Sequence, residues 1–358
     1  MYNIILDKER LEWKEKIRRW AGGLGFIATG FTEARRNQEL EAYLQKRRQK
    51  ALNTPFEPED SRLRSDPQAV WKECLTVVVS AYPLPLSRPP QNKQGILARS
   101  AVGEDYHLLV GRKLEILGRK MIANGWKTLP PKIQVDNGPL NERALAKKAG
   151  IGWLGRNQQL IVPAYGSFVA LGLMLLDQSL PPDQILSGRC GECSNCIRAC
   201  PVQILGEKPL AAQDCLSYLT QSKQILSTEQ SAKLGGRLFG CDTCQEVCPH
   251  NEDRMRKENE NLLPLPEKSS FSETALCNDD LQRGKDLMAV LNLSTREFDK
   301  HCRLTAAGWR GKSILQRNAY LALLRAGDSR LNKWLAERGD KNNLPQLLLP
   351  YMNHRPRS

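Results

Sequence analysis

Cysteines are concentrated in one part of this 358-residue chain, where eight of the eleven fall between positions 190 and 248. The first four occur in the segment CGECSNCIRACP and follow the spacing C-x2-C-x2-C-x3-C-P. That spacing is typical of thiolates that bind 4Fe-4S clusters, because three close cysteines bind one cluster and the fourth binds a neighbouring one. The chemistry that it predicts is the transfer of single electrons.

A second run, CDTCQEVCP, contributes three more cysteines, with Val247 where a complete run would carry another ligand. Two cubane clusters need eight ligands, so Cys215 would complete the set if both clusters are complete. We therefore predict two ligand sets: Cys190, Cys193, Cys196 and Cys248 for one cluster, and Cys200, Cys215, Cys241 and Cys244 for the other.

Structural zinc is the alternative, because C-x2-C pairs also form zinc knuckles. Zinc gives no reason for the triple spacing of the first run or for the proline that follows each run. The other three cysteines, Cys74, Cys277 and Cys302, lie far apart and are interpreted as small apolar core residues. The opening segment MYNIILDKER carries charges where a signal peptide needs an apolar run, so we expect a cytoplasmic protein.

The first 181 residues alternate helical and extended patterns, which indicates an α/β domain within an α+β fold. The clearest buried strand is LTVVVSAY at 75–82, and an amphipathic helix over 106–121 and a strand over 132–136 should follow. Nearer the N-terminus we expect a strand over 25–30 and then a helix capped by Thr32.

The rest of the chain divides into a ferredoxin-like insert over 182–251, a polar linker over 252–284 and a helical, HEAT-like segment over 285–358. The net charge of +14 is uneven, since residues 301–358 hold eleven Lys and Arg against three Asp and Glu. Such a tail suits a polyanion, the alternative being a basic surface that keeps the protein soluble. No G-x-G-x-x-G fingerprint follows a predicted strand and no C-x2-C-H motif occurs, so nicotinamide and haem are not expected.

Further motifs are VDNGPLNERALAKKAGIGWLGRN at 135–157, ARSAVGEDYH at 98–107 and AGWRGKSILQRNA at 307–319. Together with the cysteine runs they resemble the epoxyqueuosine reductase family over nearly the whole chain. The resemblance implies a nitroreductase-like domain that binds cobalamin, and an enzyme that reduces the epoxide of epoxyqueuosine in a tRNA anticodon loop to the alkene of queuosine. It also implies a monomer that receives electrons from a donor such as ferredoxin or flavodoxin.

On this resemblance Asp136 is the proton donor to the departing epoxide oxygen, and burial beside the corrin ring should raise the pKa of its carboxyl. Without the resemblance, an Asp before Asn-Gly-Pro would be interpreted as a turn-forming residue. The residues that match cobalamin-binding positions are Arg99, Asn157, Thr220, Asp242 and Thr243. His107 lies near a cobalt-binding D-x-H-x-x-G pattern whose glycine is one residue late, so we interpret it as a residue of a helix start.

For contact with RNA we predict Arg310, Lys312, Arg317 and Asn318, which surround the start of a C-terminal helix beside Trp309. Basic side chains next to an exposed aromatic ring suit phosphate contacts and base stacking, and the alternative is a solvated helix face with the tryptophan buried. The chain departs from the family pattern at Asn137, Arg156, Leu173 and His250.

Two other functions remain open at this stage. One is a corrinoid-dependent, dehalogenase-like reductase of a small molecule. The other is an electron-transfer module that binds RNA or a protein partner without catalysing a reaction.

Overall fold

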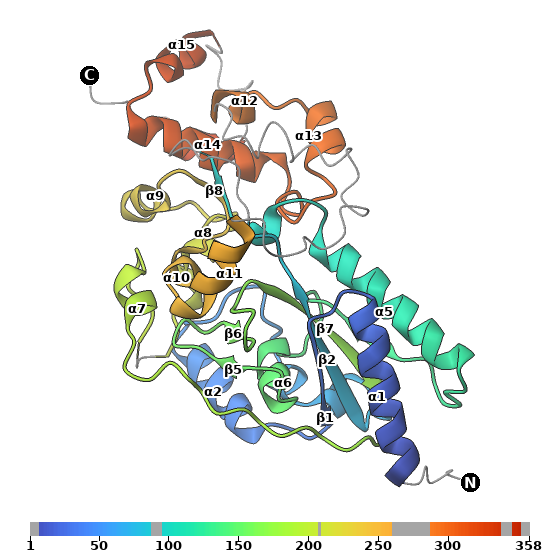
Figure 1. Ribbon diagram of the computed structural model, residues 1–358. Helices are drawn as coiled ribbons and strands as arrows, with labels where there is room; N and C mark the ends of the chain where they lie inside the picture. Colours follow the sequence, from blue (N-terminus) through green and yellow to red (C-terminus); the bar gives the residue numbers. More distant parts are fainter. Residues whose placement is uncertain (1–6, 87–94, 207–208, 260–286, 338–345, 352–358) are drawn as a thin grey trace.

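The computed structural model describes residues 7–86, 95–206, 209–259, 287–337 and 346–351. It is a mixed helix and sheet protein, in which a four-stranded sheet, a cysteine-rich region and a group of C-terminal helices follow one another along the chain (Figure 1). No helix among these residues is both long enough and apolar enough to cross a membrane. Cys277 and most of the predicted linker lie outside the described residues.

The main sheet has the strand order β1-β2-β7-β4, and every neighbouring pair is antiparallel. Its strands are β1 Ala28–Glu33, β2 Thr76–Pro83, β7 Val169–Leu176 and β4 Lys132–Gln134. All eight residues of β2 are buried because the strand is interior and both faces of the sheet are covered. Successive side chains alternate between the faces, so Val78 packs in one core while Val77 and Val79 pack in another.

Helices α1 (Asp7–Gly23) and α5 (Tyr106–Ala123) pack together on one face of the sheet, and α6 (Glu142–Lys148) covers the other (Figure 1). Helix α5 lies so close to β7 that a Cβ atom on Gly172 would stand 2.6 Å from the side chain of Leu114. It also contacts β4. This packing fixes the start of α5 relative to the end of β4, where the candidate active site lies.

The smaller elements of this region are α2 Gln38–Gln49, α3 Ser61–Ser65, α4 Pro67–Val70, β3 Ile96–Leu97, η1 Arg99–Ala101, β5 Trp153–Leu154 and β6 Leu160–Ile161. The cysteine-rich region contains α7 Asn195–Ala199, η2 Ala212–Asp214, α8 Leu216–Leu219, α9 Thr228–Leu234, β8 Arg237–Phe239, α10 Thr243–Glu246 and α11 Pro249–Asn259. Strands β3 and β8 form a parallel pair that joins the two regions.

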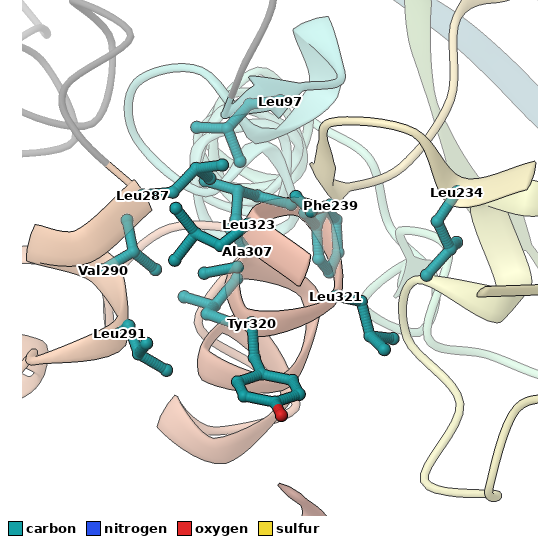
Figure 2. Packing of buried hydrophobic residues seen from close by; sticks show 14 of the residues in the cluster. Leu97, Leu234, Phe239, Leu287, Val290, Leu291, Ala307, Tyr320, Leu321 and Leu323 are labelled. Carbon is teal, nitrogen blue, oxygen red and sulfur yellow. The ribbon is translucent and has the colours of Figure 1, made fainter. Parts of the chain in front are cut away.

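The C-terminal helices share one hydrophobic core with the cysteine-rich region. They are α12 Leu287–Leu291, α13 Thr295–His301, α14 Lys312–Ala326, α15 Ser329–Glu337 and η6 Gln346–Tyr351. Leu287, Tyr320 and Leu323 belong to the same cluster as Leu97 of β3 and Phe239 of β8 (Figure 2). The cysteine-rich region therefore determines where this helical group lies.

The predicted strand at 75–82 and the helix at 106–121 are confirmed as β2 and α5, whereas two details near the N-terminus were wrong. Strand β1 begins later than predicted, at Ala28, because the chain first turns through Gly25 with a φ of 89°. Helix α2 is capped by Asn37, whose side chain accepts from the Leu40 amide at 3.1 Å, while Thr32 lies within β1. Helix α11 also extends through the first residues of the predicted linker.

Helix α14 is buried on most sides, and this corrects two of the predicted RNA contacts. Arg317 is 0% exposed and Asn318 is 1% exposed. Arg317 donates hydrogen bonds to the main-chain oxygens of Leu219 and Ser222, and Asn318 donates to that of Thr220. Both side chains satisfy buried carbonyl groups behind α8, so the prediction that they contact RNA was wrong.

We predict that Arg317→Met destabilises the protein by about 1–3 kcal/mol, because it leaves buried carbonyl oxygens without donors. Arg317→Lys should not restore stability, since an ammonium group cannot reproduce the planar array of guanidinium donors. Thermal unfolding measures both effects, with Arg296→Met on the exposed part of α13 as the control. An Arg317→Met protein that unfolds like the wild type and has lost RNA affinity would contradict this assignment.

Candidate active site and cluster-binding cysteines

The eight cysteines between positions 190 and 248 are free thiols that lie in two groups. Burial raises the pKa of the Cys244 thiol, and the nearby thiols of Cys241, Cys215 and Cys200 raise it further. Burial likewise raises the pKa of the Cys248 thiol, and so do its neighbours in the first run, Cys190, Cys196 and Cys193. The two neighbourhoods have the same members as the two predicted ligand sets.

The chain brings these thiols together by folding back on itself. Helix α7 begins beside Cys193 and ends at Cys200, which serves as its C-cap. Helix α10 contacts α7, and this contact places the second run of cysteines beside the first. Cys215 joins as the N-cap residue of α8.

A pocket of about 180 Å³ opens over the first group. The residues that line it are Arg156, Asn157, Ile161, Arg189, Cys190, Cys193, Asn195, Cys196, Cys248, Pro249 and His250. Buried thiols that raise the pKa of one another gain from metal binding, because coordination removes their protons. Across the described residues, no group of three or more His, Cys, Asp or Glu side chains is placed to hold a single metal ion. This is compatible with a 4Fe-4S cluster, because each of its four thiolates binds a different iron atom.

The structure shows what the side chains contact at three of the four positions that depart from the family pattern. Arg156 donates to the main-chain oxygen of Cys193 at 3.1 Å, and His250 packs edge-on against Trp153 in the wall of the pocket. Leu173 is fully buried in β7 and pairs with Gln134, so its side chain belongs to the core. Asn137 is exposed beside Asp136.

The residues predicted to bind cobalamin surround the segment 240–244. Arg99 is buried, and its amide donates to the carboxylate of Asp242 at 2.8 Å. Thr220 is fully buried and accepts from the amide of Gly240 at 2.8 Å, so it supports this segment through the backbone. Asn157 donates to the main-chain oxygen of Cys244 at 3.4 Å.

Thr243 also belongs to the segment 240–244, and its hydroxyl accepts a hydrogen bond of 2.8 Å from Arg237. Arg99 also pairs with Glu246 at 3.1 Å, and its guanidinium lies 4.4 Å from the centre of the Phe168 ring. These contacts tie the α/β region to the turn that carries two of the cysteines.

Asp136 stands where β4 ends, on a loop between the sheet and α6, and its side chain is 61% exposed. Tyr106 donates from its hydroxyl to the Asp136 carboxylate at 2.6 Å, and His107 Nε2 lies 3.3 Å from the same oxygen. The other imidazole nitrogen, Nδ1, lies 2.5 Å from the carboxylate of Asp105, which is the N-cap of α5. The first turn of α5 thus places a phenol and an imidazole against Asp136.

Charges in this group alter the pKa of each member. Burial would lower the pKa of His107, but hydrogen bonds to Asp105 and Asp136 outweigh it and raise the value to about 9. Protein atoms crowded around the Asp136 carboxylate would raise its pKa although the side chain is 61% exposed, yet hydrogen bonds to His107 and Tyr106 outweigh this effect and lower the value. In the chain alone the pKa of Asp136 is thus lowered, and at neutral pH the proton lies on the imidazole. The upward shift expected beside a bound corrin ring stays a prediction.

Sequence reasoning missed Tyr106 and His107 as partners of Asp136. Both lie within the quoted motif ARSAVGEDYH, and His107 is indeed at a helix start, as interpreted. Only their adjacency to Asp136, some thirty positions along the chain, indicates chemistry. The C-terminal region also reaches this site, because the amide of Asp105 donates to the main-chain oxygen of Leu304 at 3.1 Å.

Eight clustered thiols beside a mixed helix and sheet region define a two-cluster iron-sulfur protein. Residues 189–251 match the family model described as "4Fe-4S double cluster binding domain". Residues 64–137, which include Tyr106, His107 and Asp136, match the model described as "Epoxyqueuosine reductase QueG, DUF1730".

Curated relatives and solved structures agree with these matches. Epoxyqueuosine reductase of Listeria monocytogenes is 37% identical over 88% of this chain and 81% of its own length, and that of Bacillus anthracis is 34% identical over 89% and 81%. A crystal structure of selenomethionine-labelled epoxyqueuosine reductase superposes with a TM-score of 0.84 at 31% identity, covering 94% of this chain and 88% of the other. The chain belongs to the epoxyqueuosine reductase family.

We predict that His107→Gln loses stability at low pH and much less at high pH. The pKa of His107 is raised in the fold, so its contribution is complete below the unfolded value of about 6.5 and is lost as the pH rises through about 9. The ionisable groups that face it are Asp105 on its own helix, Asp136 after β4 and Glu142 on α6. Thermal unfolding of both proteins at pH of about 6 and about 10 measures the effect. If the difference in unfolding temperature between His107→Gln and the wild type were the same at both pH values, the prediction would be refuted.

Proposed function

We propose that this chain reduces epoxyqueuosine to queuosine in the anticodon loop of tRNA. Support comes from its family and from a solved epoxyqueuosine reductase, at a TM-score of 0.81, in complex with an epoxyqueuosine-modified tRNA stem loop. The observation that carries the proposal in this chain is the convergence of Tyr106 and His107 on Asp136. An exposed carboxylate with two proton-bearing neighbours suits a reaction in which an epoxide oxygen must leave as water.

The proposed cofactors are two 4Fe-4S clusters and cobalamin. One cluster binds Cys190, Cys193, Cys196 and Cys248, and the other binds Cys200, Cys215, Cys241 and Cys244, because the thiols of each set lie together. Cobalamin is held near the segment 240–244 by Arg99, Asn157, Asp242 and Thr243, since polar side chains and backbone groups suit the amide arms of a corrin. Thr220, which is fully buried, contributes by holding the Gly240 amide in place. When bound, these groups supply single electrons and a strongly reducing cobalt centre.

Reduction of an epoxide to an alkene consumes two electrons and two protons and releases water. The residues of this chain supply one of these protons to the departing oxygen, and the second comes from solvent. His107 Nε2 passes its proton to the Asp136 carboxylate 3.3 Å away, and Asp136 passes it to the departing oxygen. Tyr106 holds the carboxylate in place through its 2.6 Å hydrogen bond, and Asp105 fixes the orientation of the imidazole.

The loop that carries Asp136 is proposed to move during the reaction cycle. In a solved Bacillus subtilis epoxyqueuosine reductase, at a TM-score of 0.79, the catalytic loop is described as "swung out of the active site". In this chain the Asp136 side chain is exposed and the Asn137 that follows is exposed too. A loop at the end of a short edge strand can move without disturbing the sheet.

The proposed partners are tRNA and an external one-electron donor such as ferredoxin or flavodoxin, and we propose that the protein is a monomer. Because its proposed substrate is tRNA, we expect the protein in the cytoplasm. With Arg317 and Asn318 buried, the proposed RNA contacts are Arg310 and Lys312. Trp309 beside them is 51% exposed, and the Arg310 guanidinium lies 4.8 Å from the centre of its ring. This pair suits a base and a phosphate.

We further propose a nitroreductase-like cobalamin domain over 1–181, a ferredoxin-like domain over 182–251, a linker over 252–284 and a HEAT-like segment over 285–358. The main sheet lies wholly within the first range, and the eight clustered cysteines lie within the second. The helical pair α14 and α15 supports the last assignment.

We predict that Asp136→Asn lowers turnover by about 10²–10⁴-fold, because an amide cannot carry the proton to the oxygen. The assay uses anaerobic reconstituted protein with cobalamin, a chemical reductant and an RNA stem loop that contains epoxyqueuosine, and it measures queuosine by mass spectrometry. Asp7→Asn, on the exposed start of α1, is the control. Equal conversion by Asp136→Asn and the wild type would refute the assigned role, and wild-type protein that converts none would favour a non-catalytic electron-transfer module.

We predict that Cys215→Ala lowers the iron content from about eight to about four atoms per chain, because one cubane loses a ligand while the other keeps all four. Cys74→Ala and Cys302→Ala are matched controls, since both are buried thiols outside the two groups. Iron and sulfide analysis of anaerobically purified protein decides the matter. Full iron in the Cys215→Ala protein, or zinc in the wild type, would contradict the ligand assignment.

A further inference from the structure

Asp136 has a backbone conformation that residues with a side chain adopt uncommonly. Its φ is 54°, in the left-handed region, which Asn and Asp enter more often than other L-residues but still rarely. The amide of Asn137 donates to the main-chain oxygen of Val135, so the chain turns sharply at Asp136. A strained residue of this kind persists only where its surroundings hold it.

The atom that holds it belongs to Glu142. The amide of Asp136 donates to Glu142 Oε1 at 2.6 Å, and this is the same oxygen that accepts from Gln134 Nε2 at 3.1 Å. Glu142 is the first residue of α6, whose N-cap is Asn141. The carboxyl therefore reaches back from a helix that is packed against the sheet to the backbone of the active-site loop.

Gln134 holds the other side of the same loop. Its Nε2 donates to the main-chain oxygen of Leu140 at 3.0 Å, and its Oε1 accepts from the Leu140 amide at 3.1 Å. Gly138 lies so close over this side chain that an added Cβ atom would stand 2.1 Å from it. The loop from Val135 to Leu140 is thus wrapped around Gln134, with Glu142 bonded to both Gln134 and Asp136.

We propose that Glu142 is a positioning residue, which holds the Asp136 backbone in the conformation that brings its carboxylate to Tyr106 and His107. The inference rests on the proposed function and deepens it by naming what keeps the catalytic loop in place. Burial and the adjacent Asp136 together raise the pKa of Glu142 to about 8, so a proton on Glu142 near neutral pH keeps a second negative charge away from Asp136. A hydrogen-bond acceptor at Oε1, and not the charge, is what the loop requires.

Two conservative variants separate these requirements. Glu142→Gln keeps an oxygen at the same reach on a side chain that cannot ionise, whereas Glu142→Asp keeps a carboxyl on a shorter side chain that falls short of the Asp136 amide. We expect the Gln variant to rescue turnover to within about 3-fold of the wild type and the Asp variant to lose about 10-fold or more, which corresponds to one lost backbone hydrogen bond. The loss should be in kcat more than in KM, because RNA binding does not depend on this loop bond.

A second readout is independent of activity. Hydrogen exchange measured by mass spectrometry should show faster exchange of the segment 135–140 in Glu142→Asp and wild-type protection in Glu142→Gln. The visible absorbance of the clusters reports on the rest of the fold, and Glu229→Asp on the exposed face of α9 controls for shortening a glutamate in a helix.

Two outcomes would overturn the proposal: Glu142→Asp that keeps wild-type turnover and protection, or Glu142→Gln that loses as much as Glu142→Asp. Wild-type protein without activity on the epoxyqueuosine stem loop would instead count against the proposed function. In that case the exchange data on segment 135–140 would still decide whether Glu142 holds the loop.

Discussion

The return of Cys248 to the first cysteine run is the contact on which the rest of the structure depends. Cys248 lies far along the chain from Cys190, yet the two thiols lie in one group. Cys200 belongs to the first run in sequence, but its thiol lies with those of the second group. This exchange forces the region between them to fold back on itself and brings α7 against α10. Because the buried thiols repel as thiolates, the arrangement gains stability from cluster binding, so folding and cofactor assembly are coupled.

That folded-back region also supports its neighbours on both sides. Toward the sheet, Arg99 and Asp242 join the α/β region to the turn between Cys241 and Cys244. Toward the C-terminus, Arg317 and Asn318 satisfy the carbonyl groups behind α8. A change in one region therefore reaches the other two through buried polar contacts, which are costly to leave unpaired.

The candidate active site is built from segments that are distant in sequence but adjacent across the packing of α5 on the sheet. Tyr106 and His107 come from the first turn of α5, and Asp136 comes from the loop after β4. The strained backbone of Asp136 is held from a third element, because Glu142 belongs to α6 on the opposite face of the sheet. The proton transfer that we propose at this site thus depends on how precisely three packed elements are held together.

The amino-acid sequence by itself determined the cluster chemistry, the buried strand β2, the helix α5 and the family, because ligand spacing and hydrophobic alternation are local properties that the chain carries wherever it folds. Only the tertiary structure decided that Arg317 is buried and that the pKa of Asp136 is lowered. A basic residue on a helix has the same sequence pattern whether water or a second helix covers it, and a pKa depends on neighbours that sequence spacing does not reveal. The partners of Asp136 could not be inferred for the same reason, since Tyr106 and His107 meet it only when α5 packs beside β4.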